Sequence, residues 1–459
     1  MIDVGAVGEL REIDDLEIDT SIEALRAARS DKSGLVSQSP PLAVVYPSST
    51  EAVRETLIWA NSRDVPVVTR GAGSGLSGGA IGQSGELVVS LERMDKILEI
   101  SVDDRLARVQ AGVINSDLDS KAREHGLWFA PDPSSRKWST VGGNIATNAG
   151  GLLCAKYGVT RESVLELTVV LMDGRVLTTG HRSVKGVTGF DLVSLFVGSE
   201  GLLGIIAEAT VKLLPVPQHN PFTLAARFQS VSDAAQTCLD IAQAGHTPAL
   251  LELIDAPALR YIHHYFNLPA PQSDEVLLIA QADGADAEES IHQFAALCEH
   301  NGGKVEVGLD GTDSEELLEL RRAMHPAMEA IGKVLIEDIS VPRSQLRAMF
   351  EEIRVLEKKW GVEIPTVAHA GDGNFHPNFI VHGDEVPDDI WHAADEMFRT
   401  AIRLGGTLTG EHGVGSLKMR WLRDELGSEQ LTIQRQIKHV FDPKGLLNPG
   451  KVFPETLTT

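Results

Sequence analysis

Residues 70–80 read RGAGSGLSGGA, a run with five glycines that directly follows the short apolar run of residues 65–69. Glycine has no Cβ and tolerates positive φ, so such a run can fold into a concave nest of backbone N–H groups that surrounds a diphosphate closely. The stretch therefore predicts a binding loop for an anionic cofactor. A glycine-rich surface loop is the alternative.

Three of these glycines, Gly73, Gly75 and Gly78, also satisfy the dinucleotide pattern G-x-G-x-x-G. A Rossmann unit would need a helix of about ten or more residues directly after the glycines, with its N-terminus at the pyrophosphate. Here a strand-like run begins at residue 86, and further glycines lie at positions 79, 82 and 85. Because a helix would not survive those glycines, the Rossmann interpretation fails on length.

The length and the charge of the chain limit its class. At 459 residues the chain is too long for one core and predicts two or three domains. A formal net charge of −24 disfavours nucleic acid and anionic lipid as partners, so local donors must hold any anionic cofactor. No apolar run reaches the length of a membrane span and the N-terminus is acidic, which favours a cytoplasmic location and leaves peripheral membrane association open. Cys154, Cys238 and Cys298 lack C-x-x-C spacing, so neither a disulfide framework nor an iron–sulfur site is indicated.

Strand and helix signals alternate on both sides of the glycine loop. In the N-terminal part they predict helices at 22–28, 51–60 (with Thr50 as N-cap) and 115–125, and strands at 42–46, 87–91, 97–102, 107–111, 165–171, 175–179 and 209–214, with 165–171 and 175–179 joined as a hairpin by Asp173-Gly174. Prolines at positions 215, 217 and 221 then indicate a domain boundary. Beyond them the pattern is typical of an α+β domain with an antiparallel sheet. Its expected strands are 223–228, 249–254, 276–280 and 304–307, and its expected helices 232–244, 287–301, 314–331 and 344–359, with a final helix at 428–441.

Two polar motifs in the C-terminal half indicate chemistry. Residues 367–378 read VAHAGDGNFHPN, and residues 410–415 read GEHGVG. His369 and His376 flank a glycine turn, and Glu411 comes from a separate loop; two imidazoles and one carboxylate form the ligand set of an open zinc site. The alternative is a pair of loop histidines that only make hydrogen bonds. Asp372 is interpreted as a turn or outer-shell residue.

Together these motifs resemble the FAD-dependent 2-hydroxy-acid dehydrogenases of the vanillyl-alcohol-oxidase-type flavoprotein family. Three more stretches carry the resemblance: TVGGNIATNAGG at 140–151, GSEGLLGI at 198–205 and NPGKVF at 448–453. Nearest by eye are the catalytic subunit of bacterial glycolate oxidase, D-lactate dehydrogenase and D-2-hydroxyglutarate dehydrogenase. The resemblance runs in order from about residue 42 to the C-terminus.

The family implies an α+β fold, with a two-part FAD-binding domain of the vanillyl-alcohol-oxidase type and an α+β cap domain that carries an antiparallel sheet. The expected division is an FAD-binding domain at 1–217, a cap or substrate domain at 218–415, and a C-terminal segment at 416–459 that returns to the FAD domain.

The resemblance also implies the site residues. FAD, bound without a covalent link, would have its pyrophosphate in the loop of Arg70, Gly71, Ala72, Gly73, Ser74, Gly75, Leu76, Ser77 and Gly78. The flavin would lie along Thr140, Gly142, Gly143, Asn144, Thr147 and Gly150, the adenine–ribose side along Gly201 and Ile206, and Asn448 over the isoalloxazine, with Pro131, Asp132 and Glu200 as further contacts. His369, His376 and Glu411 would hold a divalent metal, zinc first and manganese second. His412 would be the base, Asn378 a substrate contact and Arg321 the carboxylate-binding arginine, with Arg322 as the alternative.

The activity implied is oxidation of a short D-2-hydroxy acid, of the D-lactate or glycolate type, to the 2-oxo acid. In the hydroxyglutarate enzymes a lysine stands where this chain has Ile336, and the following Glu337 disfavours a second substrate carboxylate. D-2-hydroxyglutarate dehydrogenase is nevertheless one alternative.

Two other classes are weighed against this activity. A non-catalytic flavin subunit of a larger oxidase would keep the glycine loops but would not need the His/Glu motifs. A relative of the ether-lipid synthases would need a run of adjacent histidines, for which only His263 and His264 are present. The electron acceptor, a partner redox protein and a homodimer stay open, and neither nucleic acid nor an integral membrane segment is expected.

Overall fold

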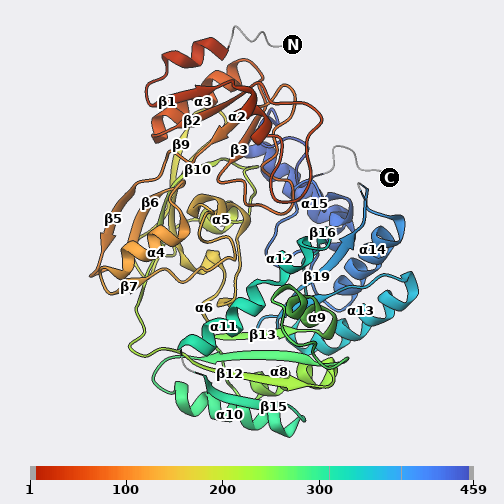
Figure 1. Cartoon of the computed structure of the whole chain (residues 1–459). Helices are drawn as coiled ribbons and strands as arrows, with labels where there is room; N and C mark the ends of the chain where they lie inside the picture. The colour runs from red at the N-terminus through yellow and green to blue at the C-terminus, as the bar shows by residue number, and fades with distance from the viewer. Residues whose placement is uncertain (1–6, 310, 384, 454–459) are drawn as a thin grey trace. The chain divides into compact units, whose positions relative to one another are not determined.

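A computed structural model describes residues 7–309, 311–383 and 385–453, and these divide into two compact units (Figure 1). Unit 1 takes the residues up to Gly151, Gly158–Val216 and the chain from Glu411 onward. Unit 2 takes Leu152–Tyr157 and Pro217–Gly410. The chain therefore leaves unit 1 for the whole of unit 2 and then returns to it. The sequence-based division into domains at residues 217 and 415 stays a prediction.

The first sheet of unit 1 has four strands in the order β1-β2-β4-β3, with β1 (Leu16–Asp19), β2 (Ala43–Pro47), β3 (Val67–Arg70) and β4 (Leu87–Ser90). Strands β2, β4 and β3 are parallel, and β1 pairs antiparallel with β2. Helix α3 (Thr50–Ser62) connects β2 to β3, whereas β3 and β4 are joined by the glycine loop without a helix. The rejection of a Rossmann unit is thus confirmed.

The cap of α3 differs from the prediction. Ser49, not Thr50, is the N-cap, because its Oγ accepts a hydrogen bond from the Ala52 N–H at 3.2 Å. Thr50 is already the first helical residue. Either hydroxyl could serve as a cap by residue type, so the register of the first turn decides between them.

The second sheet of unit 1 is antiparallel, in the order β5-β6-β10-β8-β9. Its strands are β5 (Ile97–Ser101), β6 (Leu106–Gln110), β8 (Val164–Val170), β9 (Val176–Gly180) and β10 (Ile205–Lys212). The β8–β9 hairpin turns at Asp173-Gly174, as its sequence predicts, and Gly174 has a φ of 85°. The remaining elements of the unit are η1 (Gly8–Glu12), α2 (Ile22–Ala27), α4 (Asn115–Arg123), β7 (Leu127–Trp128), α5 (Val141–Thr147), η2 (Thr160–Ser163), α7 (Leu192–Phe196), β11 (Leu214–Pro215), η4 (Met419–Trp421) and α15 (Leu422–Phe441).

Unit 2 is built on one antiparallel sheet with the path β15-β12-β14-β13-β18-β19-β16, to which β17 adds by pairing with β19. Its strands are β12 (Phe222–Phe228), β13 (Leu250–Ile254), β14 (Val276–Ala282), β15 (Lys304–Leu309), β16 (Lys333–Ile336), β17 (Ile339–Ser340), β18 (Thr366–His369) and β19 (Asn374–Val381). The antiparallel α+β architecture expected from the sequence is confirmed. No described helix is both long and apolar enough to cross a membrane.

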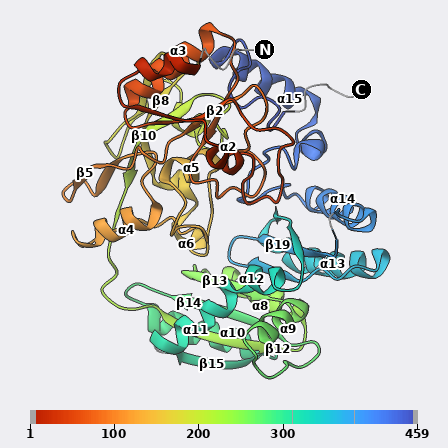
Figure 2. The ribbon, with the colours of Figure 1, turned by 45° about the horizontal axis from the view of Figure 1, so that its top comes forward.

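Helices cover the sheet of unit 2. Side chains of α9 (Ala256–Tyr265), α11 (Gly311–Arg322) and α12 (Met324–Glu329) form one apolar cluster with alternate residues of the strands, among them Leu250 and Ile254. Helices α13 (Leu346–Trp360) and α14 (Asp388–Arg403) pack side by side (Figures 1 and 2). The other helices of the unit are α6 (Cys154–Tyr157), α8 (Val231–Gln243), η3 (Arg343–Gln345) and α10 (Ala287–His300). The single helix predicted at 314–331 is wrong: it breaks at Ala323, because Pro326 cannot donate to the preceding turn and crowds it.

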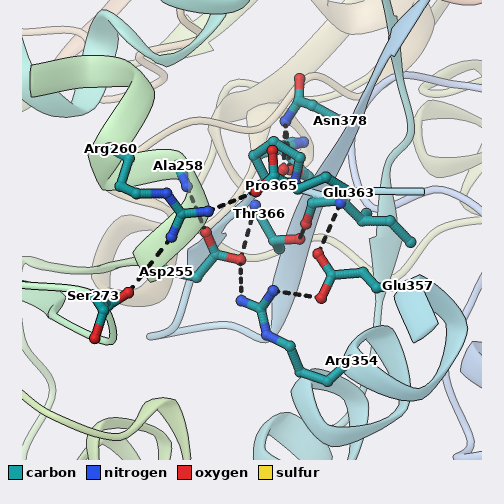
Figure 3. A network of polar contacts seen from close by, with 12 residues as sticks. Asp255, Ala258, Arg260, Ser273, Arg354, Glu357, Glu363, Pro365, Thr366 and Asn378 are labelled. Atoms are coloured by element: carbon teal, nitrogen blue, oxygen red, sulfur yellow. Dashed lines mark hydrogen bonds and ion pairs between the residues drawn. The ribbon is translucent and has the colours of Figure 1, made fainter. Parts of the chain in front are cut away.

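A buried polar network ties the end of β13 to three neighbouring segments (Figure 3). Asp255 caps α9 by accepting from the Ala258 N–H at 2.8 Å, and its other oxygen accepts from the Thr366 N–H at 3.0 Å and from Arg354 Nη2 at 2.8 Å. Burial raises the pKa of Asp255 to about 6, against the opposing effect of Arg354 and the two N–H donors. The folded protein therefore pays a desolvation cost for this carboxylate that Arg354 offsets.

Replacing Arg354 should destabilise unit 2. Arg354→Met would leave the ionised Asp255 buried without a cation, and we expect the unfolding free energy to fall by about 2–4 kcal/mol at about pH 8. The pKa of Asp255 in the folded state is about 6 with Arg354 present, and removing this cation raises it further, so Asp255 is protonated at a higher pH in the variant and the loss should shrink as the pH falls from about 8 to about 6. Urea unfolding at the two pH values measures both effects.

Arg347→Met is the matched control on the same helix, because Arg347 pairs with Glu351 where both side chains are more than half exposed. It should leave the unfolding transition in place. An Arg354→Met transition that coincides with that of Arg347→Met would show that the network does not stabilise the unit.

Candidate active site

Arg70, the first residue of the glycine loop, also contacts the last residue of that loop, Ala80. Arg70 ends β3, and its guanidinium donates to the carbonyl oxygens of Ser30 at 2.9 Å and Ala80 at 3.0 Å. Within the loop Gly73 and Gly78 have φ of 68° and 80°, a conformation that L side chains rarely adopt. Burial lowers the pKa of Arg70. This cation therefore holds the start and the end of the loop together from inside the protein.

The second glycine-rich stretch forms a short helix rather than a loop. Helix α5 begins after Thr140, whose Oγ1 accepts from the Gly143 N–H at 3.2 Å, and it ends at Asn148 in the left-handed conformation. A Cβ on Gly71 would lie 2.5 Å from Thr140 Oγ1, so the glycine loop can approach this helix only because residue 71 has no side chain. The N–H groups of the first turn of α5 are thus brought beside the glycine loop.

Asn448 joins two further segments to these. Its Oδ1 accepts from the Thr69 N–H at 2.9 Å, and its Nδ2 donates to the Glu200 carbonyl oxygen at 2.6 Å. A Cβ on Gly201 would come within 2.7 Å of the same Nδ2. The end of β3, the turn at residues 200–201 and the C-terminal segment therefore meet at this amide.

These segments enclose one cavity in unit 1, with about 1210 Å³ of empty space that is partly open to solvent. Most of the expected cofactor residues line it: Gly71, Ala72, Gly73, Ser74, Gly75, Leu76, Ser77, Thr140, Gly142, Gly143, Asn144, Thr147, Gly150, Glu200, Gly201, Ile206 and Asn448. Four expected residues are not among the lining residues: Arg70, Gly78, Pro131 and Asp132. Gly79 and Ala80, which belong to the predicted binding loop, also line it, and the lining residues that the sequence analysis did not place in the cofactor site are Thr69, Leu91, Pro133, Ser134, Ser135, Ala146, Ala149, Gly204, Glu411 and His412.

The chemistry of the lining suits a large polar ligand. Asn144 Nδ2 and Thr69 Oγ1 are buried in it and have no hydrogen-bond partner among the described residues. Buried polar groups are nearly always paired, so these two atoms mark positions where a ligand or water would bond. The small residues of the glycine loop leave their N–H groups accessible to an anion. The residues present therefore fit a dinucleotide-sized cofactor.

Glu200 fixes the loop that carries Glu411 and His412. Its two carboxylate oxygens accept from the N–H groups of Val414 and Gly415, both at 2.8 Å. Burial raises the pKa of Glu200, while these two donors and Lys418 oppose the rise. On the other side of the loop, Ser77 Oγ donates to the His412 carbonyl oxygen at 3.1 Å. The side chains of Ser77 in the glycine loop and of Glu200 thus bond to the main chain of the GEHGVG motif and hold it at the cavity.

A second group of predicted residues lies in unit 2, on one face of its sheet. His369 on β18 stands directly opposite Glu252 on β13, and His376 on β19 stands opposite Val367 on β18. Since partners in an antiparallel pair point to the same side and alternate residues share a face, Asn378 lies on this face as well. The His369 and His376 rings meet edge to face with centroids 5.0 Å apart. Two imidazoles this close can share one ion.

The two candidate arginines have different environments. Arg321 is 8% exposed, and its Nε donates to Glu252 Oε2 at 2.6 Å. The neighbouring Arg322 pairs with Glu315 where both side chains are close to half exposed or more. The buried arginine beside the histidine face is therefore Arg321. Asp372 accepts from the Asn374 N–H at 3.1 Å and is a turn residue, as the sequence indicated.

The expected catalytic set is divided between the units. Arg321, His369, His376 and Asn378 belong to unit 2, whereas Glu411 and His412 belong to unit 1 and line its cavity. Glu411 follows Gly410 of unit 2 by one peptide bond, and a Cβ on Gly410 would lie 2.2 Å from Asn374 Oδ1. Sequence analysis did not find Glu252. Its only signal is an acidic residue within an otherwise apolar predicted strand, LLELI.

Comparison with known proteins places the two halves of the chain in flavoprotein families. A family model for an FAD binding domain matches residues 41–180, and one for the C-terminal domain of FAD linked oxidases matches residues 217–452. Glycolate oxidase subunit GlcD of Bacillus subtilis (strain 168) is 41% identical over 425 residues, which cover 91% of this chain and 90% of that protein. D-lactate dehydrogenase of Archaeoglobus fulgidus is 36% identical over 89% of this chain and 90% of its own length.

Solved structures share the fold at lower identity. p-Cresol methylhydroxylase with substrate bound matches with a TM-score of 0.77 and 16% identity, over 98% of this chain and 96% of that chain. Alkyldihydroxyacetonephosphate synthase matches with a TM-score of 0.74 and 19% identity, over 98% of this chain and 86% of that chain. These similarities confirm the fold class expected from the sequence.

Removing the Glu200 carboxylate should weaken the binding of FAD. Glu200→Ala leaves the Val414 and Gly415 N–H groups without their acceptor, which frees a loop that lines the cavity. A lost bond to a buried charged group predicts an FAD dissociation constant about 5- to 100-fold higher, measured by flavin fluorescence on dilution. Glu208→Ala is the control, because Glu208 pairs with Arg108 and does not line the cavity. Equal FAD affinities in Glu200→Ala and the wild type would contradict this role.

Proposed function

This chain belongs to the FAD-linked oxidases of the vanillyl-alcohol-oxidase type, and on that premise we propose that it oxidises a short D-2-hydroxy acid to the 2-oxo acid. Membership of the family makes it an FAD-linked oxidoreductase. The observation that carries the proposal is the position of His412, because this proposed base lines the same cavity as the glycine loops. A non-catalytic flavin subunit would not need a base there.

The cavity residues of unit 1 would hold FAD without a covalent link. When bound, FAD supplies the acceptor for a hydride, and the protein supplies position and charge. Relatives that attach FAD do so through a histidine in the glycine loop or a cysteine in the second glycine stretch. Ser74 stands at the first place, and residues 140–151 contain no cysteine. Because the chain lacks both the histidine and the cysteine that would form the link, we propose that FAD binds without a covalent bond.

Arg321 is proposed to bind the carboxylate common to all substrates of this class. Its Nε is occupied by Glu252, and among the described residues its Nη1 and Nη2 have no partner. A guanidinium so anchored can offer its two terminal nitrogens to a carboxylate as parallel donors. Asn378 on the same sheet is proposed as a further substrate contact. His412 would remove the hydroxyl proton as the Cα–H bond breaks.

His369, His376 and Glu411 are proposed to hold a divalent metal, zinc first and manganese second. The close imidazole pair of unit 2 supports two of the ligands, and the position of Glu411 directly after Gly410 supports the third by chain connectivity. A divalent ion in such a site would lower the pKa of a coordinated hydroxyl. That is the chemistry which removal of the hydroxyl proton at neutral pH requires.

The substrate class is proposed from the relatives and from one departure in the sequence. The relatives are named glycolate oxidase subunit and D-lactate dehydrogenase. Ile336 on β16 lies opposite Asn378 on β19. The hydroxyglutarate enzymes are expected to carry a lysine at the position of Ile336, and the adjacent Glu337 is buried in this chain. D-lactate or glycolate is therefore proposed, with D-2-hydroxyglutarate as the alternative.

Partners of the chain are proposed only by class. Because the B. subtilis relative is named a subunit, a complex with a partner protein is proposed, and a cytoplasmic location stays a prediction. Oxygen, a quinone and a homodimer remain open.

The metal assignment predicts that its three ligands act as a unit. Replacing His369, His376 or Glu411 by alanine should lose both the metal and the activity, because an open three-ligand site cannot spare a ligand. His412→Asn should instead keep metal and FAD and slow flavin reduction by roughly 10²–10⁴-fold. Elemental analysis and anaerobic stopped-flow absorbance measure the two effects. Full activity in a metal-free preparation would return the histidines to hydrogen-bonding roles.

Arg321→Met should reduce kcat/KM without displacing FAD. The change removes the paired donors for a group present in every substrate, and we expect a loss equivalent to about 2–4 kcal/mol. Arg322→Met is the matched control one position along the helix and should retain the wild-type kcat/KM. Equal losses in the two variants would refute the assignment of Arg321.

A further inference from the structure

A buried carboxylate joins the proposed substrate arginine to a proposed metal ligand. Glu252 on β13 is fully buried, and neither the metal nor the substrate contacts proposed above include it. Its Oε2 accepts from Arg321 Nε at 2.6 Å, and its Oε1 lies 2.7 Å from His369 Nδ1. Each oxygen thus faces a different functional side chain.

The 2.7 Å contact with Glu252 favours one tautomer of His369. Oε1 can accept a hydrogen bond from Nδ1, which would place the ring proton on Nδ1. The lone pair of that ring would then be on Nε2, the nitrogen that would bind an ion. Metal-bound histidines commonly donate their other N–H to a carboxylate, which fixes both the tautomer and the ring orientation.

The same carboxylate fixes Arg321. The Nε bond holds the guanidinium plane while Nη1 and Nη2 have no partner among the described residues. The charges of Glu252 and Arg321 also compensate each other in a buried position, so His369 need not be charged to balance the carboxylate. The strand register explains the geometry, because Glu252 and His369 are direct partners in the β13–β18 pair.

We infer that Glu252 is a positioning residue that couples metal binding to substrate binding, by orienting His369 and Arg321 through separate oxygens. This inference rests on the proposed function. Beyond that function, we infer that Glu252 influences both the affinity for the metal and the affinity for the hydroxy acid, although it contacts neither of them.

Glu252→Gln tests the coupling, because a glutamine has a single acceptor oxygen and presents an amide N–H₂ to a second donor. It cannot accept from both Arg321 Nε and His369 Nδ1. On the full-length protein with FAD bound, we would measure the Zn²⁺ dissociation constant by competition with a fluorescent chelator, together with KM and kcat for D-lactate. We expect Zn²⁺ to bind about 10- to 100-fold more weakly and KM to rise roughly tenfold.

Two further variants separate this role from a general structural one. Arg321→Lys should raise KM, because it loses the two terminal nitrogens, but keep the Zn²⁺ dissociation constant within about threefold of the wild type, because a cation still balances Glu252 and Oε1 still accepts from His369. Glu275→Gln is the matched control: it makes the same change at a carboxylate that directly precedes strand β14 of the same sheet, pairs with Arg227 and is absent from the proposed site. It should leave both constants unchanged.

The outcomes distinguish the inference from the proposed function. Wild-type Zn²⁺ affinity and KM in Glu252→Gln, with Zn²⁺ lost in His369→Ala, would overturn the inference and leave the metal site standing. Equal Zn²⁺ affinity in His369→Ala and the wild type would overturn both. If Glu252→Gln does not fold, imidazole ¹⁵N chemical shifts of the metal-free wild type, assigned with His369→Ala, still decide: a proton on Nδ1 supports the role of Glu252, and a proton on Nε2 contradicts it.

Discussion

The close approach of four backbone segments around the cavity of unit 1 is the constraint on which the rest of this structure depends. The glycine loop reaches Thr140 at a distance that a Cβ on Gly71 would prevent, and Gly201 reaches Asn448 in the same way. Because these segments lie so close together, the main-chain N–H groups of the glycine loop and of the first turn of α5 can line one cavity. The absence of a helix between β3 and β4 follows from the same constraint, since the loop itself must turn around the ligand.

Local donors rather than net charge govern the electrostatics of the protein. The chain carries a formal charge of −24, yet it belongs to a family that binds an anionic dinucleotide. Main-chain N–H groups can hold such a ligand because their dipoles act at short range, where the screened field of the distant carboxylates is weak. The buried carboxylates have specific donors for the same reason: Glu200 has two N–H groups, Asp255 has Arg354 and two N–H groups, and Glu252 has Arg321 and His369. Glu200 and Glu252 each contact a segment or side chain of the proposed site.

The sequence predicted those features that depend on local chemistry. The glycine loop, the Asp173-Gly174 hairpin and the antiparallel sheet of unit 2 all follow from short-range patterns, and most residues of the expected cofactor set line one cavity. The failures depend on distant partners or on register. Arg70 binds carbonyl oxygens of its own unit instead of lining the cavity, and the pairing of Glu252 with His369 spans 117 positions of the chain. No periodicity in the sequence encodes such a pairing, because strand register across a sheet is set by tertiary packing.

The proposed function requires that a hydroxy acid reduces a flavin held in the cavity of unit 1. The direct test is anaerobic mixing of the FAD-loaded protein with D-lactate or glycolate, followed through the visible flavin absorbance. We expect these acids to bleach the flavin faster than D-2-hydroxyglutarate does, and the 2-oxo acid to appear in an amount equal to the flavin reduced. A flavin that stays oxidised with every 2-hydroxy acid, in a preparation that contains FAD and metal, would contradict it.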